Sequence, residues 1–114
     1  MIIALDFDDT ISRDVEMFTN IMWKFRDYNY EPIIVTYRHR DLDFDSVLWD
    51  LEIMNEFKVY YTDGKAKDKF MKDLGINVDI WIEDNPRAVY EDSAWKHDSP
   101  ELHAWREENK KKSA

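Results

Sequence analysis

Two carboxylates, Asp6 and Asp8, directly follow a short apolar run at residues 1–5. Side chains two residues apart share one face of an extended backbone, so both carboxylates would point the same way. Carboxylates that close repel each other unless a proton or a cation lies between them. A hard divalent cation with oxygen ligands, for which magnesium is the best fit, relieves that repulsion. The spacing therefore predicts a magnesium site at the end of the first strand.

Two simpler interpretations of this acidic pair compete with the metal site. Acidic residues after a strand often form only a turn or a helix N-cap. A calcium loop counted from Asp6 would need Gly and Glu where this chain has Ile11 and Met17, which excludes it. The apolar run before the pair and Thr10 after it favour a functional site over a plain turn.

Polar side chains also end two later apolar runs. Thr36 follows residues 33–35, and Glu83 and Asp84 follow residues 78–82. An unbroken apolar run such as residues 33–35 is typical of a strand buried on both faces of a parallel sheet, and residues 78–82 are predicted as a further strand. Since ligands bind at the carboxyl ends of such strands, we expect these side chains to meet Asp6 and Asp8 at one edge of the sheet.

Cationic groups are expected near the same edge. Lys65 and Lys67 lie at the start of a predicted helix after the third strand, residues 57–61. Metal-binding carboxylates, a hydroxyl and an ammonium together are what phosphoryl transfer needs, because the phosphate charge must be neutralised while a nucleophile is aligned. Lys67 is preferred over Lys65 because Phe70 and Met71 follow it at three and four residues, on the expected inward face of the helix.

The elements that must position these groups follow from apolar spacing. Helical periodicity predicts a helix over residues 14–28 capped by Asp14, and another over residues 65–74 with Leu74 inward and Gly75 ending it. A third helix, around Leu48 and Leu51, is preceded by acidic residues that we interpret as N-terminal helix charges, with a place at the rim of the site as the alternative. These acidic residues are Asp41, Asp43 and Asp45. A final helix is expected around Leu102 and Trp105.

This order alternates strands and helices. With short links and right-handed crossovers, it predicts an α/β fold: a three-layer α/β/α Rossmann-like sandwich around a central parallel sheet, with residues 1–114 as a single domain.

Composition narrows the function classes. The chain of 114 residues has no cysteine and no apolar run near the ~20 residues that span a bilayer, so we expect a soluble, cytoplasmic protein without a membrane partner. Its net charge of −9 disfavours long nucleic acid as a partner. Because it has only two glycines, a glycine-rich phosphate-binding loop is excluded.

Four motifs in this order resemble those of the haloacid dehalogenase (HAD) superfamily, whose members are mostly phosphatases. The first is residues 6–10 (DFDDT), the second is residues 33–36 (IIVT), the third is Lys65 or Lys67, and the fourth is residues 80–84 (IWIED). The resemblance covers most of the chain, and it implies a HAD-like fold and a magnesium-dependent phosphomonoester hydrolase.

The resemblance also implies a role for each motif residue. Asp6 would be the nucleophile that forms an aspartyl-phosphate, and Asp8 would be the general acid and base. Thr36 and the motif lysine would hold the phosphoryl oxygens. Magnesium would bind the Asp6 carboxylate, the backbone carbonyl of Asp8, and Asp84, with Glu83 contributing directly or through water. Glu83 replaces the Asp or Gly of many relatives.

The chain has no room for the cap domain that many HAD phosphatases insert after the first or third strand. We therefore expect a capless member whose site is open to a phosphorylated end or covered by a second copy of the chain; a nucleotide or a small phosphometabolite is the other substrate class. Arg13, Arg38 and His39 follow the first two motifs. Solvated surface is the simpler interpretation for each, and Arg38 is kept as a candidate phosphate contact.

Two alternatives to a phosphatase remain. A receiver-like regulatory domain also builds a magnesium-bound aspartyl-phosphate, but there an acidic pair precedes the phosphoacceptor, whereas here the DxD motif comes first and an acidic pair follows the lysine. An inactive HAD-like fold that only binds phosphoryl groups is the second alternative, and the intact motif residues argue against it.

Overall fold

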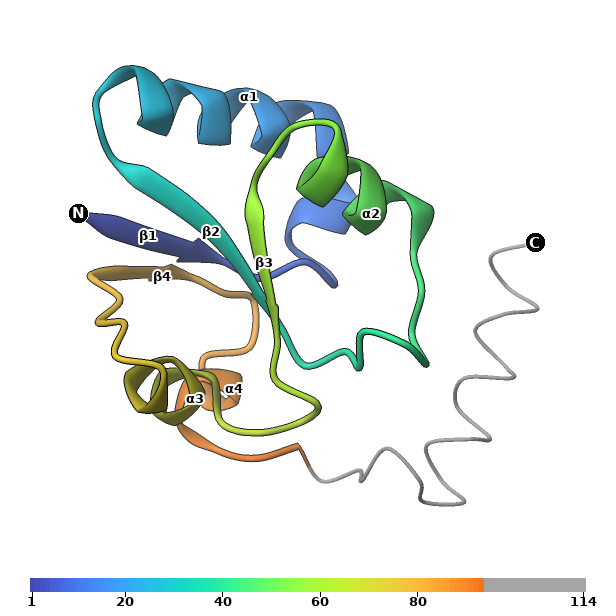
Figure 1. Cartoon of the computed structure of the whole chain (residues 1–114), viewed down its shortest axis with the longest axis vertical. Helices are drawn as coiled ribbons and strands as arrows, with labels where there is room; N and C mark the ends of the chain where they lie inside the picture. Colours follow the sequence, from blue (N-terminus) through green and yellow to red (C-terminus); the bar gives the residue numbers. More distant parts are fainter. Residues whose placement is uncertain (94–114) are drawn as a thin grey trace.

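The computed structural model describes residues 1–93, and in this part of the chain four parallel strands alternate with helices (Figure 1). The strands are β1 (Ile2–Leu5), β2 (Glu31–Thr36), β3 (Lys58–Tyr61) and β4 (Ile80–Ile82). The helices are the 3-10 helix η1 (Ile11–Arg13) and the α-helices α1 (Val15–Asp27), α2 (Ser46–Ile53), α3 (Lys67–Asp73) and α4 (Arg87–Tyr90).

The sheet has the order β3-β2-β1-β4. The chain steps outward from β1 to β2 to β3 and then returns to the other side of β1 for β4, so the direction of winding reverses between β1 and β4. Parallel pairing of these two strands reaches their carboxyl ends, where the Asp6 N–H donates to the Ile82 carbonyl at 2.9 Å. In open α/β sheets this reversal point is where ligands bind.

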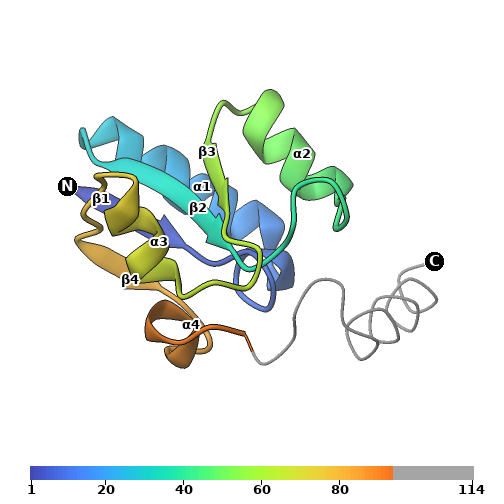
Figure 2. The ribbon, with the colours of Figure 1, turned by 60° about the horizontal axis from the view of Figure 1, so that its bottom comes forward.

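Helices cover both faces of the sheet, which gives three layers (Figure 2). On one face, Leu5 and Ile34 pack with Met22 of α1 and with Leu48 of α2. On the other face a second apolar cluster packs against α3; its buried members are Ala4, Ile33, Val35 and Met71. Alternate residues of each strand thus serve opposite cores, which explains why the strands are apolar without alternation. The predicted three-layer α/β architecture with a central parallel sheet is confirmed.

The expected helix starts agree with the structure where a side chain caps them. The Asp14 carboxylate accepts the Met17 N–H at 3.1 Å, and the Asp45 carboxylate accepts the N–H groups at the start of α2. The Asp43 carboxylate accepts the His39 N–H at 2.7 Å inside the preceding loop.

The prediction of a helix over residues 65–74 was partly wrong. α3 begins at Lys67, two residues later than expected, and Leu74 is 54% exposed and does not face inward. The helix ends at Asp73, the chain turns at Gly75 with φ of +80°, and Ile76 returns to pack on the core instead.

The last part of the chain differs from the expectation in two ways. The short helix α4 was not predicted, and the helix expected around Leu102 and Trp105 lies outside the described residues. Within residues 1–93, η1 and α1 occupy the connection after β1, and a turn leads from β3 to α3, so neither connection contains an inserted domain. None of the helices in this part is both long enough and apolar enough to cross a bilayer.

Candidate functional site

Three carboxylates meet at the reversal point of the sheet. Asp6 follows β1, and Glu83 and Asp84 follow β4; one oxygen from each lies within 4.8 Å of the others. The three differ in access, since Asp6 is buried, Glu83 is half-buried and Asp84 is exposed. Thr10 reaches the same group, and its hydroxyl donates to Asp84 at 3.4 Å. The sequence prediction that these acidic residues converge is confirmed.

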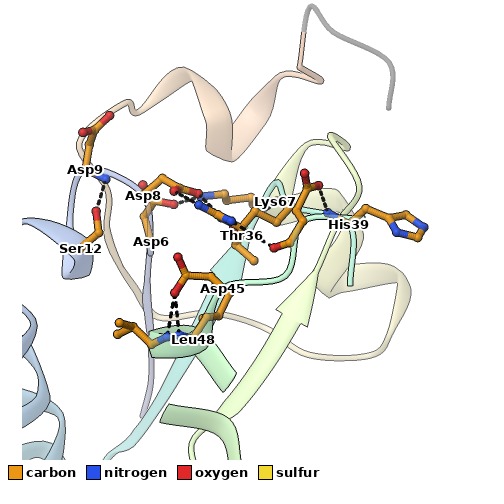
Figure 3. A network of polar contacts seen from close by, with 12 residues as sticks. Asp6, Asp8, Asp9, Ser12, Thr36, His39, Asp45, Leu48 and Lys67 are labelled. Carbon is orange, nitrogen blue, oxygen red and sulfur yellow. Dashed lines mark hydrogen bonds and ion pairs between the residues drawn. The ribbon is translucent and has the colours of Figure 1, made fainter. Parts of the chain in front are cut away.

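A buried ammonium lies among these carboxylates. Lys67 Nζ is 2.8 Å from Asp6 Oδ1 (Figure 3). The same ammonium is 2.5 Å from Glu83 Oε1, and Lys67 is only 1% exposed. Lys67 is the first residue of α3, so the start of that helix aims the side chain at the end of β1. Lys65 is exposed on the surface. The structure therefore brings Lys67 into the cluster and leaves Lys65 outside it.

The pKa values of two carboxyl groups in the cluster shift in opposite directions. Burial raises the pKa of Asp6 to about 9, against the opposing effect of the Lys67 charge; hydrogen bonds with Glu83 and Asp84 raise it further. The hydrogen bond from Asp6 lowers the pKa of Asp84. A pKa of about 9 favours the protonated form of Asp6 near neutral pH when no cation is bound. The ammonium of Lys67 alone does not compensate three ionised carboxylates.

Asp8 does not join this cluster through its carboxylate. Arg38 holds both of its oxygens, with Nη2 at 2.7 Å from Oδ1 and Nε at 2.9 Å from Oδ2. The guanidinium also donates to the Asp43 carbonyl at 3.1 Å and lies 5.5 Å from the centre of the Phe7 ring. The expectation that Arg38 is solvated surface is wrong, because its side chain is only 23% exposed. The signal available in the sequence was its place two residues after Thr36, in the loop that follows β2.

Thr36 ends β2 beneath this pair and is fully buried. Its hydroxyl oxygen accepts the Arg38 N–H at 3.2 Å, which fixes the oxygen and leaves the hydroxyl proton to donate. Figure 3 shows Thr36, Asp6, Asp8 and Lys67 gathered at the strand ends. The residues named from the second and third motifs are thus adjacent to those of the first.

Tyr37 is a part of the site that the sequence reasoning missed. Its ring centre lies 5.3 Å from Lys67 Nζ, within the range of a cation–π contact. Burial, with Glu83 as the largest of several nearby negative charges, raises the pKa of the Tyr37 phenol to about 12, so the hydroxyl stays protonated. A backbone hydrogen bond joins the loop after β2 to the loop after β3, since the Gly64 N–H donates to the Tyr37 carbonyl at 2.9 Å. Its position directly after Thr36 was the signal available in the sequence.

The remaining candidates lie at the rim. Arg13 is an exposed residue whose side chain is 73% exposed, as expected. The His39 ring accepts the N–H groups of Asp41 and Leu42, so this histidine organises its own loop. Asp9 adopts φ of +60° in the turn after β1, and its N–H donates to the Ser12 hydroxyl at 2.9 Å (Figure 3). That turn brings Asp8 and Thr10 back over the end of the strand.

An open hollow of about 430 Å³ flanks the carboxylate cluster between the end of β4 and the start of α1. Thr10 and Phe18 line one side, and Ile82, Glu83 and Asp84 line the other. Since one water occupies about 30 Å³ of liquid, the hollow accommodates a hydrated cation beside the carboxylates. The donors available there are carboxylate oxygens, the ligand type that magnesium and calcium take.

Comparisons with protein-family models, with curated proteins and with solved structures found no match for this chain.

Proposed function

We propose that this protein is a capless member of the HAD superfamily and a magnesium-dependent phosphomonoester hydrolase that works through an aspartyl-phosphate on Asp6. One observation carries the proposal: a buried ammonium, Lys67, lies between the carboxylates of Asp6 and Glu83 at the carboxyl ends of β1 and β4. A phosphoryl group needs such a cation to offset its charge, next to the nucleophile that attacks it.

Magnesium would be held by the carboxylates of Asp6 and Asp84, with Glu83 completing the set directly or through water. The fit is supported by the donor set, since the three carboxylate oxygens lie within 4.8 Å of one another and all are hard ligands. When bound, the ion supplies charge neutralisation for the phosphoryl oxygens and for the carboxylates around it. The backbone carbonyl of Asp8 remains the further ligand that the HAD resemblance implies.

The chain's own residues would carry the two chemical steps. An Asp6 carboxylate oxygen attacks phosphorus, and the bond from phosphorus to the ester oxygen breaks. Asp8, after it has left Arg38 and taken up a proton from solvent, gives that proton to the leaving alkoxide. Asp8 then takes a proton from water as the water oxygen attacks phosphorus. The bond from phosphorus to Asp6 breaks, and inorganic phosphate leaves with Asp6 restored.

Thr36, Lys67 and Arg38 would hold the phosphoryl group. The Thr36 hydroxyl and the Lys67 ammonium each have a proton to donate to a phosphoryl oxygen. Arg38 presents a planar fork that suits phosphate as well as carboxylate. A phosphate dianion arriving at this fork competes with Asp8 for it, which releases Asp8 for proton transfer.

The absence of an inserted domain after β1 or β3 in residues 1–93 bears on the substrate. With no lid from those connections, the strand ends admit a nucleotide, a small phosphometabolite or a phosphorylated macromolecular end. A second copy of the chain is the partner that would exclude water if the substrate is small.

One observation favours a second candidate, a receiver-like or phosphoryl-binding regulatory domain. Arg38 occupies both oxygens of Asp8, and a carboxylate fixed in this way is poorly placed to activate water. If Arg38 stays on Asp8 after phosphorylation, the aspartyl-phosphate would persist and act as a signal. The lifetime of the phosphorylated protein separates the two functions.

The test is turnover of p-nitrophenyl phosphate by the intact chain in magnesium chloride and in EDTA. We expect magnesium-dependent turnover that falls at least about a thousandfold in Asp6→Asn, because the nucleophile is removed while the shape is kept. Asp27→Asn, at the exposed last residue of α1, is the control and should match the wild type. Absence of magnesium-dependent turnover, or full activity in Asp6→Asn, refutes the phosphatase.

A further inference from the structure

The start of α3, which carries Lys67, has no cap of its own. Its N-cap residue is Ala66, which lacks a side-chain oxygen. The carboxylate of Asp92 satisfies another of the first N–H groups of this helix, since Oδ1 accepts the N–H of Ala66 itself at 2.8 Å, the donor that the acidic side chain of a capping box normally takes. Next to it, the Ser93 N–H donates to the Gly64 carbonyl at 2.6 Å. A segment that follows α4 thus closes the beginning of an earlier helix.

The same segment fixes the aromatic ring beside the ammonium. The Tyr37 hydroxyl donates to the Glu91 carbonyl, and the Tyr37 ring lies 5.3 Å from Lys67 Nζ. We call residues 91–93 the clasp. The clasp therefore contacts two structures that surround Lys67: the helix start that holds its backbone and the ring that faces its charge.

Position matters more for Lys67 than for an ordinary buried residue. The first turn of a helix is its weakest part, because the N–H groups there have no partner within the helix. In a reaction that depends on alignment, a displacement of about 1 Å at the reacting groups costs roughly a hundredfold in rate. A seven-residue helix without its own cap is a poor support for such a group.

We propose that Asp92 is a positioning residue for Lys67: by capping α3 from outside, it keeps the ammonium against Asp6. The inference rests on the proposed function, because it assigns Asp92 to the same phosphoryl site. Asp92 touches neither the carboxylate cluster nor Thr36 in the described structure and acts through Ala66 and the first turn of α3.

The kinetic test compares Asp92→Ala with Asp92→Asn in the intact chain, using p-nitrophenyl phosphate and magnesium. Loss of one capping hydrogen bond should lower kcat/KM about tenfold in Asp92→Ala. Asp92→Asn keeps an oxygen acceptor and should recover most of that loss. Asp73→Asn, at the other end of α3, is the matched charge control and should match the wild type. Wild-type kcat/KM in Asp92→Ala, or an equal loss in Asp92→Asn, overturns the inference.

A second readout does not depend on turnover. The Phe70 N–H donates to the Ala66 carbonyl at 3.0 Å and closes the first turn of α3, so its hydrogen exchange reports how firmly that turn is held. We expect about tenfold faster exchange at Phe70 in Asp92→Ala and near wild-type exchange in Asp92→Asn. Unchanged exchange in Asp92→Ala refutes the cap. If the wild type shows no turnover, the phosphatase fails while this measurement still decides the cap.

Discussion

Replacing Lys67 with methionine tests whether the ammonium compensates the carboxylate cluster. Methionine keeps much of the length and the apolar stem of lysine but removes the charge. In the wild type, Lys67 Nζ lies 2.8 Å from Asp6 and 2.5 Å from Glu83, and the lysine is 1% exposed. Lys67→Met therefore leaves the carboxyl groups of Asp6 and Glu83, whose side chains are 9% and 4% exposed, without their cation.

The expected loss of stability follows from this burial. Removing one partner of a buried ion pair destabilises a protein by roughly 3–5 kcal/mol, because an uncompensated charge stays behind. Asp6 limits the loss, since its pKa of about 9 lets it stay protonated near neutral pH. We therefore expect the lower end, a decrease of about 3 kcal/mol in the free energy of unfolding, or roughly 10–15 °C in Tm.

Magnesium should reduce the difference in the free energy of unfolding between the wild type and Lys67→Met. A divalent cation bound by the same carboxylates compensates the charge that Lys67 no longer offsets, and its binding to the folded state adds about 2.7 kcal/mol at a hundred times Kd. Urea unfolding of the wild type, Lys67→Met and the exposed control Lys65→Met, each with and without magnesium at matched ionic strength, measures both effects. Lys65→Met should stay within about 0.5 kcal/mol of the wild type.

Two results would refute this reasoning. If Lys67→Met and Lys65→Met unfold with equal free energy, the buried ammonium does not compensate Asp6 and Glu83. If magnesium stabilises the wild type and Lys67→Met equally, the ion does not bind the carboxylates that Lys67 contacts.

Two further predictions concern the loops at the strand ends. Arg38→Lys should raise KM for p-nitrophenyl phosphate about tenfold in steady-state kinetics. Lysine cannot present the planar fork that now holds both oxygens of Asp8. An unchanged KM would show that Arg38 does not bind the phosphate. Asp9→Val should lower the free energy of unfolding by about 1–2 kcal/mol, whereas Asp9→Gly should not, because the φ of +60° at residue 9 disfavours a β-branched side chain. Urea unfolding that ranks the two variants in the opposite order would contradict this.

The sequence was informative where a local pattern carries the information. Apolar runs predicted the parallel strands, and the residues that end those runs predicted that Asp6, Glu83 and Asp84 meet at one edge. Helical spacing favoured Lys67 over Lys65, and the structure places Lys67 in the cluster. These inferences succeeded because the face of a strand or helix follows from its period.

Contacts between distant segments could not be predicted in the same way. The pairing of Arg38 with Asp8 joins loops 30 residues apart, and the cap that Asp92 provides joins segments 26 residues apart. Neither pairing leaves a periodic signal in the chain. The end of α3 shows a related limit, since the turn at Gly75 exposes Leu74, whereas helical spacing alone places it inward.

Acid quenching during turnover, followed by mass spectrometry of the peptide that contains Asp6, tests the central claim most directly, because acyl phosphates formed on the pathway are trapped on the residue that carries them. With p-nitrophenyl phosphate and magnesium, we predict one phosphoryl group on Asp6, absent in EDTA and absent in Asp6→Asn. Turnover without a phosphoryl group on Asp6, or with the phosphoryl group on another residue, would contradict the account.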